Sequence, residues 1–214
     1  MSVRETTLNR VRAAGRSGRI PSGSHSGSAH AVPTNVRSAL AERQDDLVAR
    51  FSRELAALGV ECHIEATADA VRDRVRSLAD GQSVFSWNSD RLPYDLGGVL
   101  SSAVTEADTR GRQAEATLGV TGCHAAIAET GSLVVLSGLG TPRAASLLPP
   151  AHVCVVRRAD LFDAMGTFFR ERAADIAGAA CCTFITGPSR TADIELTLTL
   201  GVHGPGKVTV IVGP

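Results

Sequence analysis

The sequence predicts an α/β protein: a three-layer α/β/α domain built on a largely parallel sheet. Apolar positions at helical spacing alternate along the chain with short apolar strands, which is typical of strands and helices wound into one sheet. In the second half the strands are continuous apolar runs, which suit strands covered on both faces. With 43% hydrophobic and 21% charged residues, the composition is that of a globular domain.

The first 35 residues are predicted to lie outside this domain, which then spans residues 36–214. Residues 4–14 can form one short helix. Residues 15–35 are dominated by Gly, Ser and Pro and cannot bury enough apolar surface to order themselves. Six arginines face a single acid within residues 1–37, so this segment is a basic arm, either a docking tether or a solvated leader.

The first half of the domain reads as helix, strand, helix, strand. Each helix carries apolar residues three and four positions apart and ends at a glycine, Gly59 or Gly81. The predicted elements are a helix over 36–58, a strand over 60–64, a helix over 71–78 and a strand over 84–87. Residues 88–116 show no pattern that can be assigned.

The second half supplies three buried strands and one helix. Asp160 is placed to cap that helix, whose apolar residues over 161–169 repeat at helical spacing. The predicted strands cover residues 133–136, 153–156 and 208–212.

Composition excludes several classes of function. The formal net charge is +0 and aromatic residues make up only 4%, so neither a nucleic-acid field nor a base-stacking platform is expected. No stretch approaches the ~20 apolar residues of a membrane span, and no apolar core of a signal peptide follows the first arginines. We therefore expect a cytoplasmic protein.

The five cysteines are interpreted as reduced core thiols. They are Cys62, Cys123, Cys154, Cys181 and Cys182. Because there is no C-x-x-C motif and no four-cysteine cluster, the chain is not expected to hold an iron–sulfur centre of its own.

The first polar segment runs from Gly119 to Ser132. Its glycines allow backbone angles that turn main-chain N–H groups toward a ligand. Glu129 lies before the strand over 133–136, and partial burial there would raise its pKa and make it a candidate acid, base or nucleophile. Alternatively, its carboxylate accepts hydrogen bonds from Thr130 or nearby main chain and only ties a turn together.

The second polar segment centres on Arg143, whose planar guanidinium can bind a carboxylate or phosphate. Gly138 and Gly140 do not complete a dinucleotide fingerprint, because Arg143 stands where the third glycine would be. His152, at the start of the next strand, is interpreted as a core or strand-edge histidine rather than a ligand.

The third polar segment follows a strand and opens with a glycine–proline turn. Ser189 or Thr191 can cap a short helix with Asp193 and Glu195 in its first turn, which would offer free N–H groups to an anion. The two carboxylates also favour that helix end themselves, so a purely structural cap is an alternative. Apolar alternation over 194–200 leaves a strand open as well.

The histidines do not predict a metal site. His124, His152 and His203 come from separate loops and have no spacing typical of metal ligands.

Together these segments resemble the lactate-utilisation (LUD) domain family. The resemblance is carried by GVTGCHAAIAETGS, SLLPPAHVCVV and ITGPSRTADIELTLTLGVHGP, and it is strong over the C-terminal half of the chain. It implies a fold similar to sugar-phosphate isomerases and CoA transferases (the NagB/RpiA/CoA-transferase-like fold). The motif positions that it carries over are Glu129, Thr130, Gly131, Ser132, Gly187, Pro188, Ser189, Thr191, Asp193, Glu195, His203 and Gly204.

The resemblance also implies a function, the oxidation of L-lactate to pyruvate. The chain would act beside two partner proteins that carry the iron–sulfur clusters, without a cofactor of its own. Two alternatives stay open: a stand-alone enzyme of the CoA-transferase or folate cyclo-ligase type with Glu129 as nucleophile or base, and a regulatory protein that binds a small organic acid through Arg143.

Overall fold

The computed structural model describes residues 44–191 and 199–214. The predicted helix over 4–14, the arm over 15–35 and the motif residues Asp193 and Glu195 lie outside these ranges.

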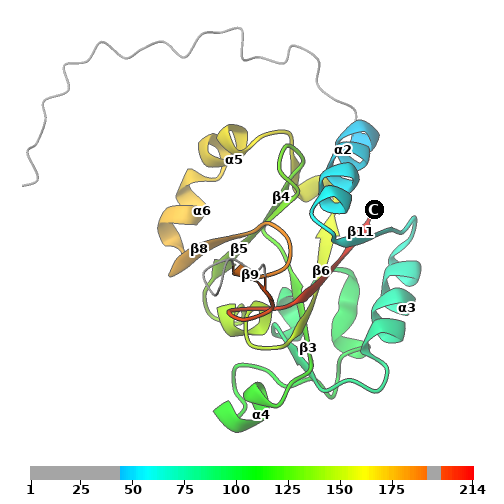
Figure 1. The fold of residues 1–214 in the computed structure, drawn as a ribbon, viewed down its shortest axis with the longest axis vertical. Helices are drawn as coiled ribbons and strands as arrows, with labels where there is room; N and C mark the ends of the chain where they lie inside the picture. The colour runs from blue at the N-terminus through cyan, green and yellow to red at the C-terminus, as the bar shows by residue number, and fades with distance from the viewer. Residues whose placement is uncertain (1–43, 192–198) are drawn as a thin grey trace, which may run out of the picture. The chain divides into compact units, whose positions relative to one another are not determined.

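A five-stranded sheet forms the centre of the described domain (Figure 1), in the order β1-β11-β6-β3-β2. All four pairings are parallel, so strands far apart in the sequence lie side by side. This confirms the predicted parallel sheet with flanking helices. The strands are β1 (Glu61–Ile64), β11 (Lys207–Gly213), β6 (Ala151–Arg157), β3 (Leu118–Gly122) and β2 (Val84–Ser86).

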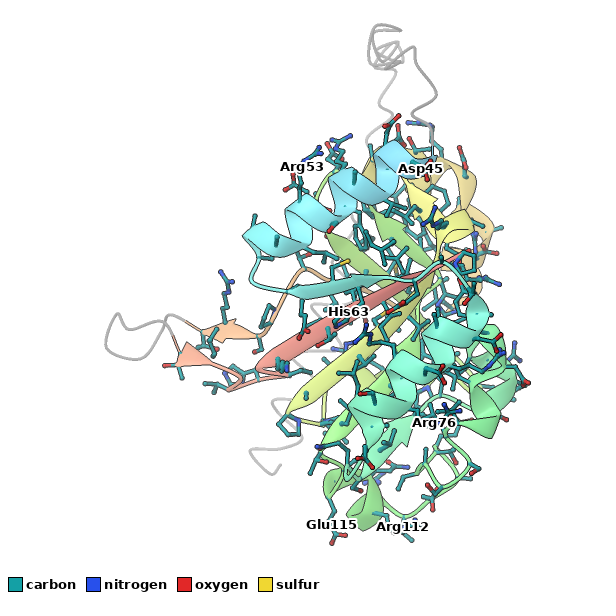
Figure 2. All side chains as sticks on the ribbon, turned by 90° about the vertical axis from the view of Figure 1, so that its right-hand side faces the viewer. Asp45, Arg53, His63, Arg76, Arg112 and Glu115 are labelled. Atoms are coloured by element: carbon teal, nitrogen blue, oxygen red, sulfur yellow. The ribbon has the colours of Figure 1, made fainter. Side chains whose placement is uncertain are left out.

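Two helices cover opposite faces of this sheet, α2 (Gln44–Ala57) and α3 (Ala68–Ala79). Figure 2 shows β1 and β11 passing between them, with the exposed Arg53 of α2 and Arg76 of α3 on the outer surfaces. Because side chains alternate along a strand, one set of β6 residues packs on each helix. Val153 and Val155 join the core of α3, while Cys154 and Val156 join that of α2. No described helix is long and apolar enough to cross a membrane.

A second sheet, of order β7-β4-β5-β8, packs against the α2 side. Its outer face is covered by α5 (Met165–Glu171) and α6 (Ala173–Gly178) (Figure 1), where Phe168 is completely buried. Pairing within it is antiparallel except between β4 and β7. Its strands are β7 (Leu161–Phe162), β4 (Ala125–Ile127), β5 (Ser132–Ser137) and β8 (Cys181–Ile185).

The predicted strand over 133–136 therefore exists, but it lies in this second sheet. A tight turn at Gly131, where φ is +66°, reverses the chain between β4 and β5. A short reversal of this kind joins antiparallel strands, whereas a parallel return requires a crossover.

The prediction that Asp160 caps a helix is wrong. The helix begins at Met165 with Ala164 as its N-cap, and residues Leu161–Phe162 form β7 instead. The Asp160 carboxylate instead accepts hydrogen bonds from Arg157, at 2.7 Å from Nε. Asp160 itself ends the short helix η5 (Arg158–Asp160).

In the third polar segment the described residues on either side of 192–198 are short strands, while most of the predicted strand over 194–200 lies outside the described residues. β9 (Arg190–Thr191) pairs antiparallel with β10 (Thr199–Leu200), so Thr191 is a strand residue.

The unassigned region 88–116 consists of short helices that connect β2 to β3. They are η2 (Ser89–Arg91), η3 (Pro93–Gly98) and α4 (Arg110–Ala114). Tyr94 and Asp95 in η3 adopt left-handed angles, with φ of 59° and 53°, and such backbone costs about 1–3 kcal/mol per residue. A further short helix, η4 (Arg143–Ser146), precedes β6.

Candidate functional site

A pocket of about 730 Å³ lies at the carboxyl ends of β2, β3 and β6. Each strand contributes the residue at which it ends or those that directly follow it: Trp87 after β2, Cys123 and His124 after β3, and Arg157 at the end of β6. Ligands of open α/β sheets bind at this edge, where the loops after the strands converge. The position and volume of the pocket are those of a small-molecule site.

Loops from other elements complete the walls. The end of β5 provides Ser137 and Gly138, η2 provides Asp90 and Arg91, and the α6 region provides Arg172 and Asp175. A smaller hollow of about 140 Å³ also touches Cys123 and Arg157 and extends to Pro93 and Asp160.

Each of the three arginines in the pocket pairs with a neighbouring aspartate. Arg157 donates from Nε to Asp160 at 2.7 Å and from Nη2 at 3.3 Å, and this hydrogen-bonded partner raises the pKa of Arg157. Arg172 donates from Nε to Asp175. Arg91 Nε lies 3.5 Å from a carboxylate oxygen of Asp90. The aspartates thus hold the Nε side of each guanidinium, and further Nη donors remain.

His124 is fixed to β5 through both its main chain and its ring. Its N–H donates to the Val134 carbonyl at 2.8 Å, and its Nδ1 accepts the Leu136 N–H at 3.1 Å. Desolvation, aided by the nearby Arg172, lowers the pKa of His124, so the ring is neutral at pH 7. Because Nδ1 is an acceptor, the proton of the neutral ring lies on Nε2.

Trp87, which is buried, and Cys123, which is half-buried, form another part of the wall. Trp87 is 2% exposed, its ring centroid lies 5.3 Å from that of His124, and its Nε1 has no partner among the described residues. The hydrogen bond with Cys154 and desolvation raise the pKa of Cys123 well above its usual value. Cys123 is therefore a protonated thiol at neutral pH and a poor nucleophile.

The strained loop at Tyr94 packs beside this edge. The Tyr94 hydroxyl donates to the Pro214 carbonyl at 2.7 Å, and burial raises the pKa of Tyr94 to about 12. A Cβ on Gly213 would lie only 2.6 Å from the Tyr94 ring, so a glycine is required where β11 ends. Strain of this kind is often found near functional sites.

Glu129 does not line the pocket. Its side chain is exposed, so the partial burial considered from the sequence is not found, and its Oε2 accepts the Met165 N–H at 3.3 Å at the start of α5. The observed donor is therefore neither Thr130 nor main chain nearby in the sequence, as the structural alternative had it, but the start of α5.

Thr130, Gly131, Ser132 and Gly187 lie against α2. The Ser132 hydroxyl is 2.7 Å from the hydroxyls of both Thr130 and Thr186. A Cβ on Gly131 or Gly187 would come within 3.1–3.2 Å of Leu58, so both glycines permit close packing on the end of α2.

The remaining motif residues lie near the amino-terminal edge of the central sheet. The Ser189 N–H donates to the Pro205 carbonyl at 2.9 Å, and Gly204 packs next to Ser189 just before β11 begins. His203 is exposed, and Pro188 is half-buried in the same connection. Since the pocket lies at the carboxyl edge, these loops are at the opposite end of the strands.

Arg143 and His152 are also apart from the pocket. Arg143 is exposed, with Nη1 3.9 Å from the Cys181 sulfur. His152 is 1% exposed and its Nε2 lies 2.9 Å from the Thr121 hydroxyl, as expected for a core histidine. Burial lowers its pKa to about 4. Among the described residues no three His, Cys, Asp or Glu side chains gather as metal ligands would.

Of the motif positions that the resemblance carries over, none within residues 44–191 and 199–214 lines the pocket, and their role in binding a ligand stays a prediction. Two of the residues that do line it were accessible to sequence reasoning. Trp87 ends a predicted strand and Arg157 directly follows one, so the strand-end rule would have selected them. Cys123 follows β3, which the sequence did not predict.

The chain was compared with known protein families, with individual proteins and with solved structures. Residues 90–212 match the model of the LUD domain. The chain is 34% identical over 154 residues to Lactate utilization protein C of Halalkalibacterium halodurans, covering 65% of this chain and 66% of that protein. It is 37% identical over 166 residues to the same-named protein of Anoxybacillus flavithermus (70% and 72% covered), and 27% identical over 190 residues to that of a Geobacillus species (79% and 78%).

A solved structure shares the fold. It is the crystal structure of a DUF162 family protein from Deinococcus radiodurans, with a TM-score of 0.65 and 22% sequence identity. The match covers 80% of this chain and 99% of that one, so the similarity extends over nearly the whole of the solved chain.

Proposed function

The chain belongs to the LUD domain family, and we propose that it acts in lactate utilisation, as the cluster-free component of a complex that oxidises L-lactate to pyruvate. The observation that carries this proposal is the alignment, over 65–79% of the chain, with relatives named Lactate utilization protein C. The aligned region spans only about two thirds to four fifths of those relatives, so the activity of the whole assembly is part of the proposal.

The positions of the cysteines support clusters that reside in partner proteins. A [4Fe–4S] cluster needs four thiolates around one centre. The five free cysteines are spread over β1, the end of β3, β6 and β8. We therefore assign the electron-carrying clusters to two iron–sulfur partners and the cytoplasm as the compartment, with the basic N-terminal arm as a candidate docking segment.

Deletion and co-purification test this role. A strain that lacks the gene should fail to grow on L-lactate but grow normally on pyruvate, and the full-length chain should restore growth. The tagged full-length protein should co-purify with two iron–sulfur proteins from lactate-grown cells. Normal lactate oxidation in the deletion strain would refute the proposal.

A second candidate function, a regulatory protein that senses an organic acid, is favoured by the pocket itself. Its walls carry Arg91, Arg157 and Arg172, with His124 between strand ends. This candidate predicts ligand binding by the isolated chain, without any effect of deleting the iron–sulfur partners. The CoA-transferase alternative has less support from the geometry, because Glu129 is exposed and hydrogen-bonded to Met165 outside the pocket.

A further inference from the structure

We propose that the pocket at the carboxyl ends of β2, β3 and β6 binds an organic anion that has at least two acidic groups and is larger than lactate. The groups that would receive it are Arg157, Arg172 and His124. This inference does not depend on the role in lactate utilisation, since it rests on the chemistry of the pocket wall.

The uncommitted polar groups of the wall are mainly hydrogen-bond donors. His124 presents Nε2–H because its Nδ1 already accepts the Leu136 N–H. The guanidinium groups of Arg157 and Arg172 keep further Nη donors beyond those that Asp160 and Asp175 take. Donors without acceptors are matched by a ligand rich in acceptor oxygens, which describes carboxylates and phosphates.

Hydrogen bonds to aspartates fix the orientation of Arg157 and Arg172 and leave donors for such oxygens. Arg172 uses Nε for Asp175, and Arg157 uses Nε and Nη2 for Asp160. In the described part of the chain no other acceptor takes the remaining Nη groups of these two arginines. A guanidinium whose orientation is already fixed loses less conformational freedom when it binds a carboxylate or phosphate.

The origin of the two arginines on different elements favours a ligand with two acidic groups over one with a single acidic group. Arg157 ends a strand of the central sheet, whereas Arg172 lies between α5 and α6, which cover the second sheet. Both nevertheless line the same pocket. Each guanidinium suits one carboxylate or phosphate, so a ligand that satisfies both carries an acidic group at each end.

The volume of the pocket also favours a ligand larger than lactate. At about 30 Å³ per water-sized atom, the six non-hydrogen atoms of lactate occupy roughly 180 Å³ or less. The pocket measures about 730 Å³. Lactate alone would leave most of it filled with water.

Calorimetric titration of the full-length protein tests the proposal, at constant ionic strength and pH 7. The probes are L-malate and citrate as carboxylates, pyrophosphate as a phosphate, and L-lactate as the single-acid reference. We expect at least one two-acid or three-acid probe to bind at least tenfold more tightly than L-lactate. The carboxylate and phosphate arms then show which acid the site takes.

Three variants locate the binding. Arg157→Gln and Arg172→Gln should each weaken the tight probe at least tenfold, the loss expected for one charge-assisted contact. Arg74→Gln is the matched control, because Arg74 is also paired through Nε, to Glu65 at 2.9 Å, and lies outside the pocket. It should change affinity less than twofold.

Three results would overturn the inference. They are equal affinity for L-lactate and the larger anions, no binding of any probe, and losses in the pocket variants no greater than in the control. Circular dichroism of each variant excludes misfolding as the cause of a loss. None of these results bears on growth on lactate, so the two proposals fail separately.

Discussion

Replacing Gly119 with alanine should destabilise the protein through a direct clash between β3 and the helix η4. Gly119 lies in the middle of the central sheet, paired with His152 on β6. A Cβ at this position would stand 2.0 Å from the main-chain carbonyl oxygen of Ala145 and 3.4 Å from Pro149. The nearest atom belongs to the backbone, so no side-chain rotation can relieve the contact.

The size of the destabilisation follows from the distance by which η4 must move away from the new Cβ. Real Cβ atoms almost never come closer than 3.0 Å to another atom, so η4 must retreat by about 1 Å. Ala145 is fully buried, which leaves little room for that movement. Overpacking of this kind costs about 1–3 kcal/mol, and a rigid obstacle places Gly119→Ala near the upper end.

Chemical denaturation of wild type and variant measures the difference in the free energy of unfolding. Gly111→Ala is the control, since Gly111 lies in α4 and a Cβ there meets no atom within 4 Å. Alanine in a helix is favoured over glycine by about 0.5–1 kcal/mol, so this variant should be unchanged or more stable. A Gly119→Ala protein as stable as wild type would refute the packing argument.

Three further results follow from buried and paired groups. Burial lowers the pKa of His152 to about 4, below its ordinary value of about 6.5, so the unfolded chain binds the extra proton first as pH falls. The His152 contribution should therefore reduce the free energy of unfolding by roughly 2 kcal/mol between pH 7 and pH 5, and denaturation of His152→Gln at both pH values should show a smaller decrease. Because the pKa of Cys123 is raised, its alkylation by iodoacetamide at pH 7.5, followed by mass spectrometry, should be slower than that of a free cysteine, and faster labelling would contradict its assignment as a thiol. Asp160→Asn removes the charged partner of Arg157 and should lower the free energy of unfolding by about 1 kcal/mol, a value reduced for the exposure of the arginine. Asp73→Asn, in an exposed pair with Arg76, is the control and should change the unfolding midpoint little. Equal effects of the two substitutions would mean that the buried Asp160 has no special role.

One sequence motif supplies residues both to the pocket and to the packing against α2. The motif GVTGCHAAIAETGS contains both Cys123–His124, which line the pocket, and Thr130–Ser132, which pack on α2. The two parts are separated by β4. Nearby positions of one motif can thus either line a pocket or pack in the core. The amino-acid sequence of the motif alone does not tell which positions do which.

The sequence by itself predicted four of the five strands of the central sheet, β1, β2, β6 and β11, but not β3. Continuous apolar runs predicted β6 and β11 as covered strands, because a strand covered on both faces is apolar at successive positions. It also favoured a core or strand-edge position for His152 over a role as a ligand. These properties are local, and periodicity reports them directly.

Only the tertiary structure decided which sheet β5 joins, which loops meet, and how the arginines are held. The turn at Gly131 sends β5 into the second sheet, and the pocket brings together side chains as far apart in the chain as Trp87 and Arg172. Such encounters depend on how separate elements pack. The pattern of apolar residues within one segment indicates which of its faces are exposed or buried. It does not indicate which other segment of the chain packs against it.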